Sequence, residues 1–197
     1  MTEEQIVRFC SPTLAGLKTA GLFTCPCEDM ACLLQELRRV NTTLNPRGLQ
    51  ALPLRCRDGK ALIYVYRPAR LQRDLAADDA ACLLRGQGYP WQDARRCLAH
   101  LVRKLRAAPR GPEQFPHEIG LFLGYPPEDV RGFMENGAQK CKCTGCWKVY
   151  GDAESAQRLF ACYRRCTALY CRLWADGARM EQLTVQEPTL AKPLCKT

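Results

Sequence analysis

The chain has 197 residues, of which 47% are hydrophobic, and a formal net charge of +9. This length is enough to bury a proper core as one domain, and no linker-like change of composition divides it. The start, MTEEQIVRF, is acidic and no window approaches 18 apolar residues, which argues against an export signal and a membrane helix, so we expect a cytoplasmic protein with no membrane partner.

The cysteine content limits the kinds of chemistry that we expect of this protein. The chain contains 14 cysteines, an unusually high number for its length. In a small secreted chain they would indicate disulfides, but this chain shows no export signal. We therefore interpret them as reduced thiols, metal ligands or redox groups.

The first predicted element is a helix from Ser11 to Gly21. Ser11 is a favourable N-cap, Pro12 suits the first helical turn, and Gly21 is a natural C-terminal glycine. Cys10 would then lie directly before a helix N-terminus, where partial positive charge lowers the pKa of a thiol. Cys10 is therefore a candidate nucleophile, and the alternative is a buried cysteine that packs as a small hydrophobic residue.

A second helix and a β-hairpin follow. Asp29 can cap a helix that runs to about Leu44. Residues 49–56 and 60–67 then flank Asp58-Gly59, and Asp-Gly between apolar runs is the strongest local signal for a hairpin. The second of these strands is continuously apolar, which predicts a central strand covered on both faces.

The middle of the chain is helical and basic. Between residues 68 and 108, the main predicted helix carries Arg96, His100 and Arg103 opposite its apolar stripe, so we expect His100 to be exposed. Residues 51–112 hold 13 basic against 5 acidic residues, and the face over residues 92–110 is a candidate site for an acidic protein or a phosphate-bearing ligand. The alternative is a solvated basic helix face, and the lack of an aromatic-interleaved motif argues against nucleic acid.

The stretch from Phe115 to Tyr150 holds the densest set of candidate site residues. A helix is predicted to begin at Pro116 and to end at Gly124, which leaves His117 and Glu118 in its first turn. The partial positive charge there favours a carboxylate at Glu118 and a neutral imidazole at His117, the form that accepts a proton or binds a metal. The alternative is that His117 only caps or packs.

A cluster of thiols follows this helix. Cys141, Cys143 and Cys146 precede a predicted strand from Trp147 to Tyr150, and the two-residue spacing between Cys143 and Cys146 lets both sulfurs reach one metal ion. Zinc or an iron–sulfur cluster needs four ligands, so the single pair is an incomplete signal.

The last predicted helix is capped by Asp152 and carries Cys166 on its apolar face. Cys166 is either a further metal ligand or a packed thiol. Periodicity is lost after Gly177, so we expect a domain over residues 1–177 and a tail over residues 178–197 that lies along the surface or frays.

Several of these blocks resemble a known family. They are Cys10 to Gly16, Pro116-His117-Glu118, Leu123-Gly124-Tyr125-Pro126, Trp147 to Tyr150 and Cys166-Thr167. Together they resemble an uncharacterised bacterial family of about 200 residues, seen mainly in anaerobes and filed as a domain of unknown function. The resemblance covers nearly the whole chain and implies a cytoplasmic setting, but it implies no activity. The chain departs from the family at Cys146, where an aromatic residue is often found, and this weakens any site that needs all three clustered cysteines.

The predicted fold class is α+β. We expect a helix-rich single domain with about six helices around a small, mainly antiparallel sheet, built on the hairpin of residues 49–67 and the strand from Trp147 to Tyr150. The chain has no dinucleotide fingerprint and no phosphate-binding glycine loop, which argues against the common nucleotide-dependent enzymes.

Three functions remain open at this stage. The first is a metal, iron–sulfur or thiol redox protein, with ligands among Cys10, Cys143, Cys146 and Cys166 or His117. The second is a hydrolase or transferase with Cys10 as nucleophile, His117 as general base and Glu118 as its partner. The third is a non-catalytic binding protein with a basic face.

Both chemical hypotheses predict one concave site. Cys10, His117 and Cys143 each lie at the edge of a predicted element, and such edges can meet at one end of a domain. We therefore expect these three side chains to converge.

Overall fold

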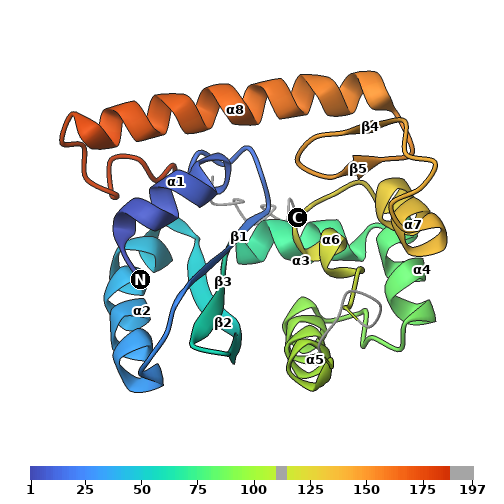
Figure 1. Cartoon of the computed structure of the whole chain (residues 1–197), viewed down its shortest axis with the longest axis horizontal. Helices are drawn as coiled ribbons and strands as arrows, with labels where there is room; N and C mark the ends of the chain where they lie inside the picture. Colours follow the sequence, from blue (N-terminus) through green and yellow to red (C-terminus); the bar gives the residue numbers. More distant parts are fainter. Residues whose placement is uncertain (110–114, 187–197) are drawn as a thin grey trace, which may run out of the picture.

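The computed structural model describes residues 1–109 and 115–186. Its centre is a three-stranded antiparallel sheet in the order β1-β3-β2, formed by β1 (Ala20–Pro26), β2 (Gln50–Arg57) and β3 (Lys60–Tyr66) (Figure 1). A separate two-stranded sheet pairs β4 (Cys143–Thr144) with β5 (Lys148–Val149). Within the described residues eight α-helices surround the sheets, so the predicted helix-rich α+β class is confirmed and the predicted number of six helices is too low.

Helices cover both faces of the main sheet. One face packs against α1 (Glu3–Leu14) and α2 (Met30–Leu44), and the other packs against α3 (Pro68–Ala76), α5 (Ala94–Ala107) and α6 (Ile119–Phe122) (Figure 1). The second layer is extended by α4 (Asp78–Gly86) and α7 (Pro127–Asn136), and a short 3-10 turn, η1 (Asn45–Arg47), follows α2.

The strand β3 is buried on both faces. Its side chains Ile63 and Val65 belong to the core under α1 and α2, whereas Tyr64 and Tyr66 belong to the core under α3 and α5. Successive side chains of a strand point to opposite faces, so a strand covered on both sides must be apolar throughout. The predicted central strand is confirmed, and the turn before it, Asp58-Gly59, has the positive φ angles of 53° and 67° that this hairpin turn needs.

The long helix α8 (Ala153–Ala175) lies across one end of the two layers and packs along α1 (Figure 1). The Asp152 carboxylate caps it as predicted, because it accepts hydrogen bonds from the first backbone N–H groups of the helix. A small third core lies between α8 and the β4–β5 hairpin and contains Trp147, Val149 and Phe160.

The described part of the segment after Gly177 packs against the domain. Met180 and Leu183 are buried in the same core as α1 and α2, and the backbone N–H of Val185 donates to the carbonyl of Leu14. Residues 178–186 are therefore held in place by apolar contacts and by the end of α1.

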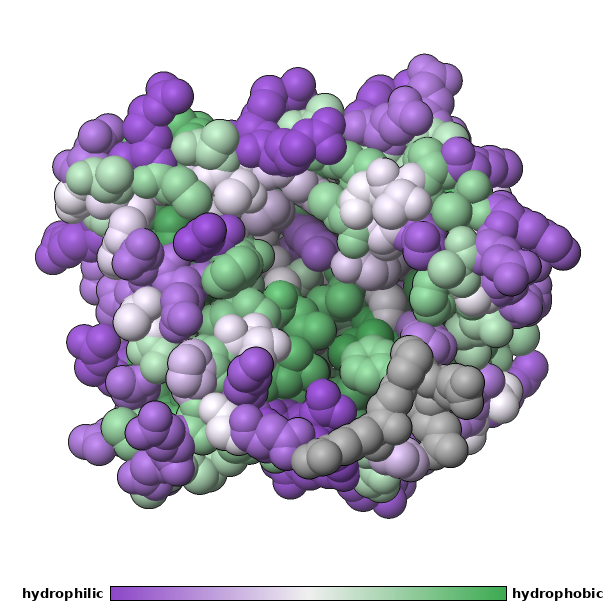
Figure 2. Space-filling view, in the orientation of Figure 1, coloured by the Kyte–Doolittle hydropathy of each residue, from purple (hydrophilic) through white to green (hydrophobic). Residues whose placement is uncertain are grey.

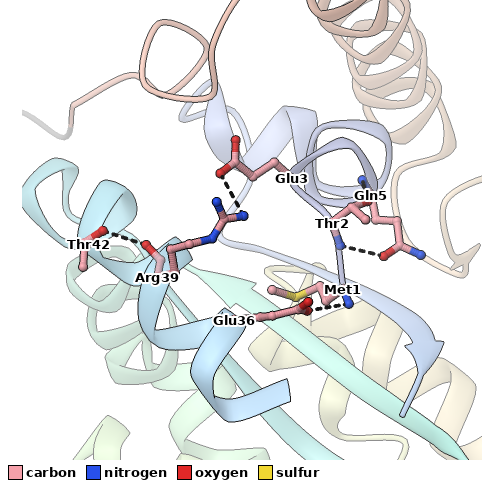
Figure 3. A network of polar contacts seen from close by, with 7 residues as sticks. All are labelled: Met1, Thr2, Glu3, Gln5, Glu36, Arg39 and Thr42. Atoms are coloured by element: carbon pink, nitrogen blue, oxygen red, sulfur yellow. Dashed lines mark hydrogen bonds and ion pairs between the residues drawn. The ribbon is translucent and has the colours of Figure 1, made fainter. Parts of the chain in front are cut away.

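The prediction for the N-terminal region is wrong. Helix α1 begins at Glu3, where Thr2 and Gln5 form a capping box and Arg39 of α2 pairs with Glu3 (Figure 3). The helix ends at Leu14, so the helix predicted to begin at Ser11 does not exist. Pro12 is tolerated because it lies in the last turn, where its missing N–H removes a single intrahelical bond. The chain then turns and enters β1, which the sequence did not indicate.

Two predictions for the region after residue 115 also need correction. The strand predicted from Trp147 to Tyr150 is reduced to β5 and pairs with β4, so it is not part of the main sheet. The helix predicted to begin at Pro116 is reduced to the single turn of α6, and His117 and Glu118 lie in a turn before it. Gly124 does end this segment, with a φ of +73° that favours glycine.

The surface is mixed in character. Figure 2 shows a central hollow in which hydrophobic side chains gather, with hydrophilic side chains around it. Over the two described ranges, the structure contains no helix of the length and apolarity needed to cross a membrane.

Candidate functional site

Three segments that are far apart in the sequence meet around a cavity of about 430 Å³. They are the end of α1 with the turn that follows it, the turn of the β4–β5 hairpin, and the middle of α8, which lies over the other two (Figure 1). We call this cavity the Lys18 pocket. Its lining residues are Phe9, Pro12, Thr13, Lys18, Gly21, Cys146, Tyr163, Arg164, Thr167 and Ala168.

The ammonium group of Lys18 is held between two aromatic rings. Its Nζ atom lies 5.0 Å from the ring centroid of Tyr125 and 6.0 Å from that of Tyr163, distances at which a cation interacts with a ring face. Burial lowers the pKa of Lys18, and the thiols of Cys146 and Cys10 partly oppose this shift. In the part of the chain that the structure describes, no carboxylate pairs with this ammonium.

A second polar group of the pocket also lacks a partner. The hydroxyl of Thr13 is the one buried side-chain polar atom, among those the structure describes, that makes no hydrogen bond. Buried polar groups are normally paired, so this orphan hydroxyl is an exception, and Thr13 itself has no exposed surface. Arg164 and Thr167 of α8 add a second cation and a second hydroxyl to the same lining.

Asp129 of α7 holds the hairpin that brings Cys146 to the pocket. Its buried carboxylate accepts hydrogen bonds from Trp147 Nε1 at 2.7 Å and from the backbone N–H groups of Tyr150 and Gly151 at 2.7 and 2.8 Å. Tyr125 stacks on Trp147 with ring centroids 4.7 Å apart, and its hydroxyl donates to the Cys146 carbonyl. Burial raises the pKa of Tyr125 to about 12, so its hydroxyl stays a donor.

Cys10 lies in the core behind this pocket and not at a helix start. It is in the third turn of α1 with no exposed surface, and a Cβ atom at Gly21 would be only 2.5 Å from its Sγ. Burial raises the pKa of the Cys10 thiol to about 12, the opposite of the shift that a helix N-terminus would give. The geometry therefore supports the alternative interpretation, a packed thiol.

His117 lies in a different cavity, of about 270 Å³, between α6, α7 and β5. Its ring meets Phe133 edge-on at 4.9 Å and lies 5.8 Å from Phe115. The stacked rings of Tyr125 and Trp147 also line this cavity, whereas neither residue belongs to the lining of the Lys18 pocket.

Glu118 points away from His117 into a buried cluster. Its carboxylate accepts hydrogen bonds from the Tyr89 hydroxyl at 2.9 Å and from the Lys104 ammonium. Tyr89 in turn stacks against His100, which is half-buried and not fully exposed as predicted, and burial lowers the pKa of His100. Glu118 is thus engaged by α5 and does not orient His117.

The structure places Cys10, His117 and Cys143 in three different surroundings. Cys10 is in the core, His117 lines the smaller cavity, and Cys143 packs beside Trp147 in the third core. These placements do not support the predicted convergence, which stays a prediction.

The four cysteines predicted as metal ligands are also spread out. Cys141 contacts Ala138 and Thr144, Cys143 packs in the third core, Cys146 lines the Lys18 pocket, and Cys166 is nearly buried in α8 with its pKa raised by burial to about 11. Over residues 1–109 and 115–186, no group of three or more His, Cys, Asp or Glu side chains is placed to hold a metal ion, and the cysteines described there are free thiols. Zinc or an iron–sulfur cluster therefore stays a prediction from the cysteine spacing.

The fold and the site define a helix-rich α+β protein with a lysine-centred pocket between its first and last helices. The chain belongs to the family described as protein of unknown function (DUF3793), whose model matches residues 6–184. This match confirms the family resemblance that was noted in the sequence. Comparison with curated proteins and with solved structures finds no match.

Sequence reasoning missed the residue at the centre of the pocket. Lys18 lies two residues after the block from Cys10 to Gly16, in a predominantly apolar context before β1, and this was the available signal. Asp129 was also missed, because an acidic residue in the first turn of a helix is normally explained by the helix dipole alone.

Proposed function

We propose that this protein binds a small organic anion, carrying a carboxylate or a phosphate group, in the Lys18 pocket. The observation that carries the proposal is a half-buried ammonium that faces a cavity, has its pKa lowered by burial, and has no carboxylate partner among the described residues. A buried charge is costly unless it is paired, and an anionic ligand would supply the missing partner.

The remaining lining suits the same class of ligand. Arg164 supplies a guanidinium that can bind a carboxylate or phosphate with two parallel hydrogen bonds. The partly exposed Thr167 hydroxyl can donate to an anionic oxygen, while Phe9 and Tyr163 offer apolar surface for the organic part. The volume of about 430 Å³ fits a small metabolite-sized molecule.

Loss of the ammonium should weaken this binding strongly. Calorimetric titration with phosphate, citrate, phenyl phosphate and benzenesulfonate should find at least one ligand, and Lys18→Met should weaken it at least tenfold. Affinity for benzenesulfonate, whose charge is constant, should also fall as pH rises toward the pKa of Lys18, which lies below the ordinary 10.5, because deprotonation removes the attracting charge.

The matched control is Lys148→Met. Lys148 lines the smaller cavity that contains His117, so its removal tests whether any anion binds there instead. Anion binding that survives Lys18→Met and is lost in Lys148→Met would reject the proposed site, and so would a protein that binds none of the four anions.

Thiol chemistry is the second candidate function, and Cys146 is the residue that favours it. Its thiol is exposed, lines the Lys18 pocket and is therefore within reach of a bound ligand, in contrast to the buried Cys10 and Cys166.

Alkylation tests this placement of Cys146. Iodoacetamide should label it well before Cys10 or Cys166, as read by peptide mass spectrometry, and a saturating anion should slow its labelling several-fold. The exposed Cys32 at the start of α2 is the internal control and should be labelled at the same rate with and without the anion. Equal labelling of Cys146 in both conditions would remove it from the binding site.

A further inference from the structure

A second and larger cavity, of about 990 Å³, lies on the opposite layer between β2, α3 and α5. We call it the α5 groove. Its floor is aliphatic and includes Leu52 of β2 and Leu98 and Val102 of α5. None of these residues contributes to the Lys18 pocket, so the α5 groove is a separate candidate binding site.

Three arginines of α5 stand along this groove. Arg95, Arg103 and Arg106 all line it and are exposed, and no acidic residue is part of its described lining. Arg103 and Arg106 lie eight and eleven residues after Arg95, so all three lie on one side of the helix. A helix rises 1.5 Å per residue, so the row of arginines is about 16 Å long. The side chain of Arg103 lies 3.1 Å from His100 Nδ1, and no carboxylate is paired with any of the three among the described residues.

This arrangement refines the basic face predicted for residues 92–110. Arg96 does not line the groove, and the Lys104 ammonium is already bonded to Glu118, so the free positive charge is concentrated on the groove side of α5. An aliphatic floor beside a row of cations is complementary to a ligand that alternates apolar and acidic groups.

We propose that the α5 groove binds an acidic, extended segment of a partner protein. A strand rises about 3.3 Å per residue, so about five residues span the row of arginines, with alternate side chains pointing to the aliphatic floor and to the guanidinium groups. Addition of this segment as a fourth strand to β2 is disfavoured, because the side chain of Asn41 already occupies both backbone polar groups of Ala51 and Pro53 lacks an N–H.

The lining favours a peptide over a nucleic acid strand. Unspecific binding of single strands relies on exposed aromatic rings on which bases stack. The aromatic ring of the groove, that of Tyr66, is buried and stacked on Tyr64, and its hydroxyl is bonded to Gln50. The groove thus offers aliphatic contacts and charge, without a stacking surface.

Fluorescence anisotropy with a labelled eight-residue peptide, in which glutamate alternates with leucine and serine, tests the proposal on the full chain. The wild type should bind the peptide, and affinity should fall as salt is raised from about 50 to about 300 mM. The triple variant Arg95→Gln, Arg103→Gln and Arg106→Gln should bind at least tenfold more weakly. These residues are exposed, so the variant should retain its circular dichroism spectrum and melting temperature.

The matched control removes the same charge elsewhere. Arg38→Gln, Arg165→Gln and Arg172→Gln replace exposed arginines of α2 and α8 and should leave peptide affinity within about twofold of the wild type. If the control variant lost as much peptide affinity as the groove variant, the loss would be explained by net charge alone and the proposal would be overturned. No peptide binding by the wild type would do the same, and tighter binding of a labelled oligothymidine that is lost in the groove variant would identify a nucleic-acid surface instead.

Discussion

Replacing Arg67 with methionine should destabilise the protein by about 3 to 5 kcal/mol. Arg67 follows β3, is almost fully buried, and donates to the carbonyl oxygens of Thr13, Leu14 and Val185 at 2.7 to 2.8 Å. The first two carbonyls belong to the last turn of α1, which has no intrahelical donors for them, and the third belongs to the segment after α8. Methionine fills a similar volume but removes all three of these charge-assisted bonds. The Thr13 and Leu14 carbonyls would keep only the backbone N–H groups of Gly16 and Val185 as donors, and the Val185 carbonyl would lose the guanidinium.

Urea unfolding followed by circular dichroism measures this loss. Arg67→Lys should fall between the wild type and Arg67→Met, because an ammonium keeps the charge but cannot reproduce the fork of the guanidinium. The Arg67→Lys variant also keeps the prediction testable if the methionine variant does not fold. The control is Arg38→Met at an exposed position of α2, where we expect a change within about 0.5 kcal/mol. A similar stability for Arg67→Met and Arg38→Met would contradict the structural role of Arg67.

Arg67 also connects the fold to the pocket. Its contacts fix the end of α1, and the chain turns from there through Gly16 to Lys18. Partial unfolding of this turn would move Lys18 relative to the rings of Tyr125 and Tyr163. The same residue therefore stabilises the domain and determines where the ammonium lies.

Local signals in the sequence were sufficient for several elements. Asp29 and Asp152 were recognised as helix caps, and Asp58-Gly59 with the apolar run behind it gave the hairpin and its central strand. These features depend on residues that are close together in the chain, so propensity and spacing predict them.

The same kind of reasoning failed at Cys10. Ser11-Pro12 is a good helix start when read locally, but an earlier capping box at Thr2 and the apolar contacts of Ile6 and Val7 begin the helix nine residues upstream of Pro12, at Glu3. The shift moves Cys10 from a helix terminus to a buried turn and reverses the direction of its pKa shift. A choice between two plausible helix starts depends on tertiary packing, which a single sequence does not contain.

The Lys18 pocket could not be predicted from the sequence for a related reason. More than 100 residues separate Lys18 from Cys146, and Thr167 lies in the middle of α8, so the meeting of the three depends on how α8 crosses α1. The sequence did mark two of these places, since Cys10 to Gly16 and Cys166-Thr167 carry the family resemblance. It could not indicate that the lysine beyond the first block, and not its cysteine, faces the cavity.

The second large effect is expected at Asp129, whose replacement by alanine should cost about 3 to 5 kcal/mol. The carboxylate is buried and accepts three hydrogen bonds, one from the Trp147 indole and two from the backbone after β5. Alanine would leave the buried indole N–H and the two part-buried backbone N–H groups without this acceptor, and charge-assisted bonds of this kind are stronger than neutral ones.

Asp129→Asn tests the indole hydrogen bond of Asp129 separately from its two backbone hydrogen bonds. The amide oxygen can still accept from the backbone of Tyr150 and Gly151, but the amide nitrogen would face the indole N–H, donor against donor. We therefore expect an intermediate loss of stability and a shift of the Trp147 indole proton in the NMR spectrum. Because Trp147 stacks on Tyr125, which contacts both Lys18 and the Cys146 carbonyl, the asparagine variant should also weaken anion binding in the Lys18 pocket. The control is Glu135→Ala, an exposed acidic residue of the same helix, which should change neither stability nor the indole signal. If Asp129→Asn kept full stability and an unchanged Trp147 signal, the β4–β5 hairpin would not depend on this carboxylate. The packing of the third core would then determine the position of Cys146.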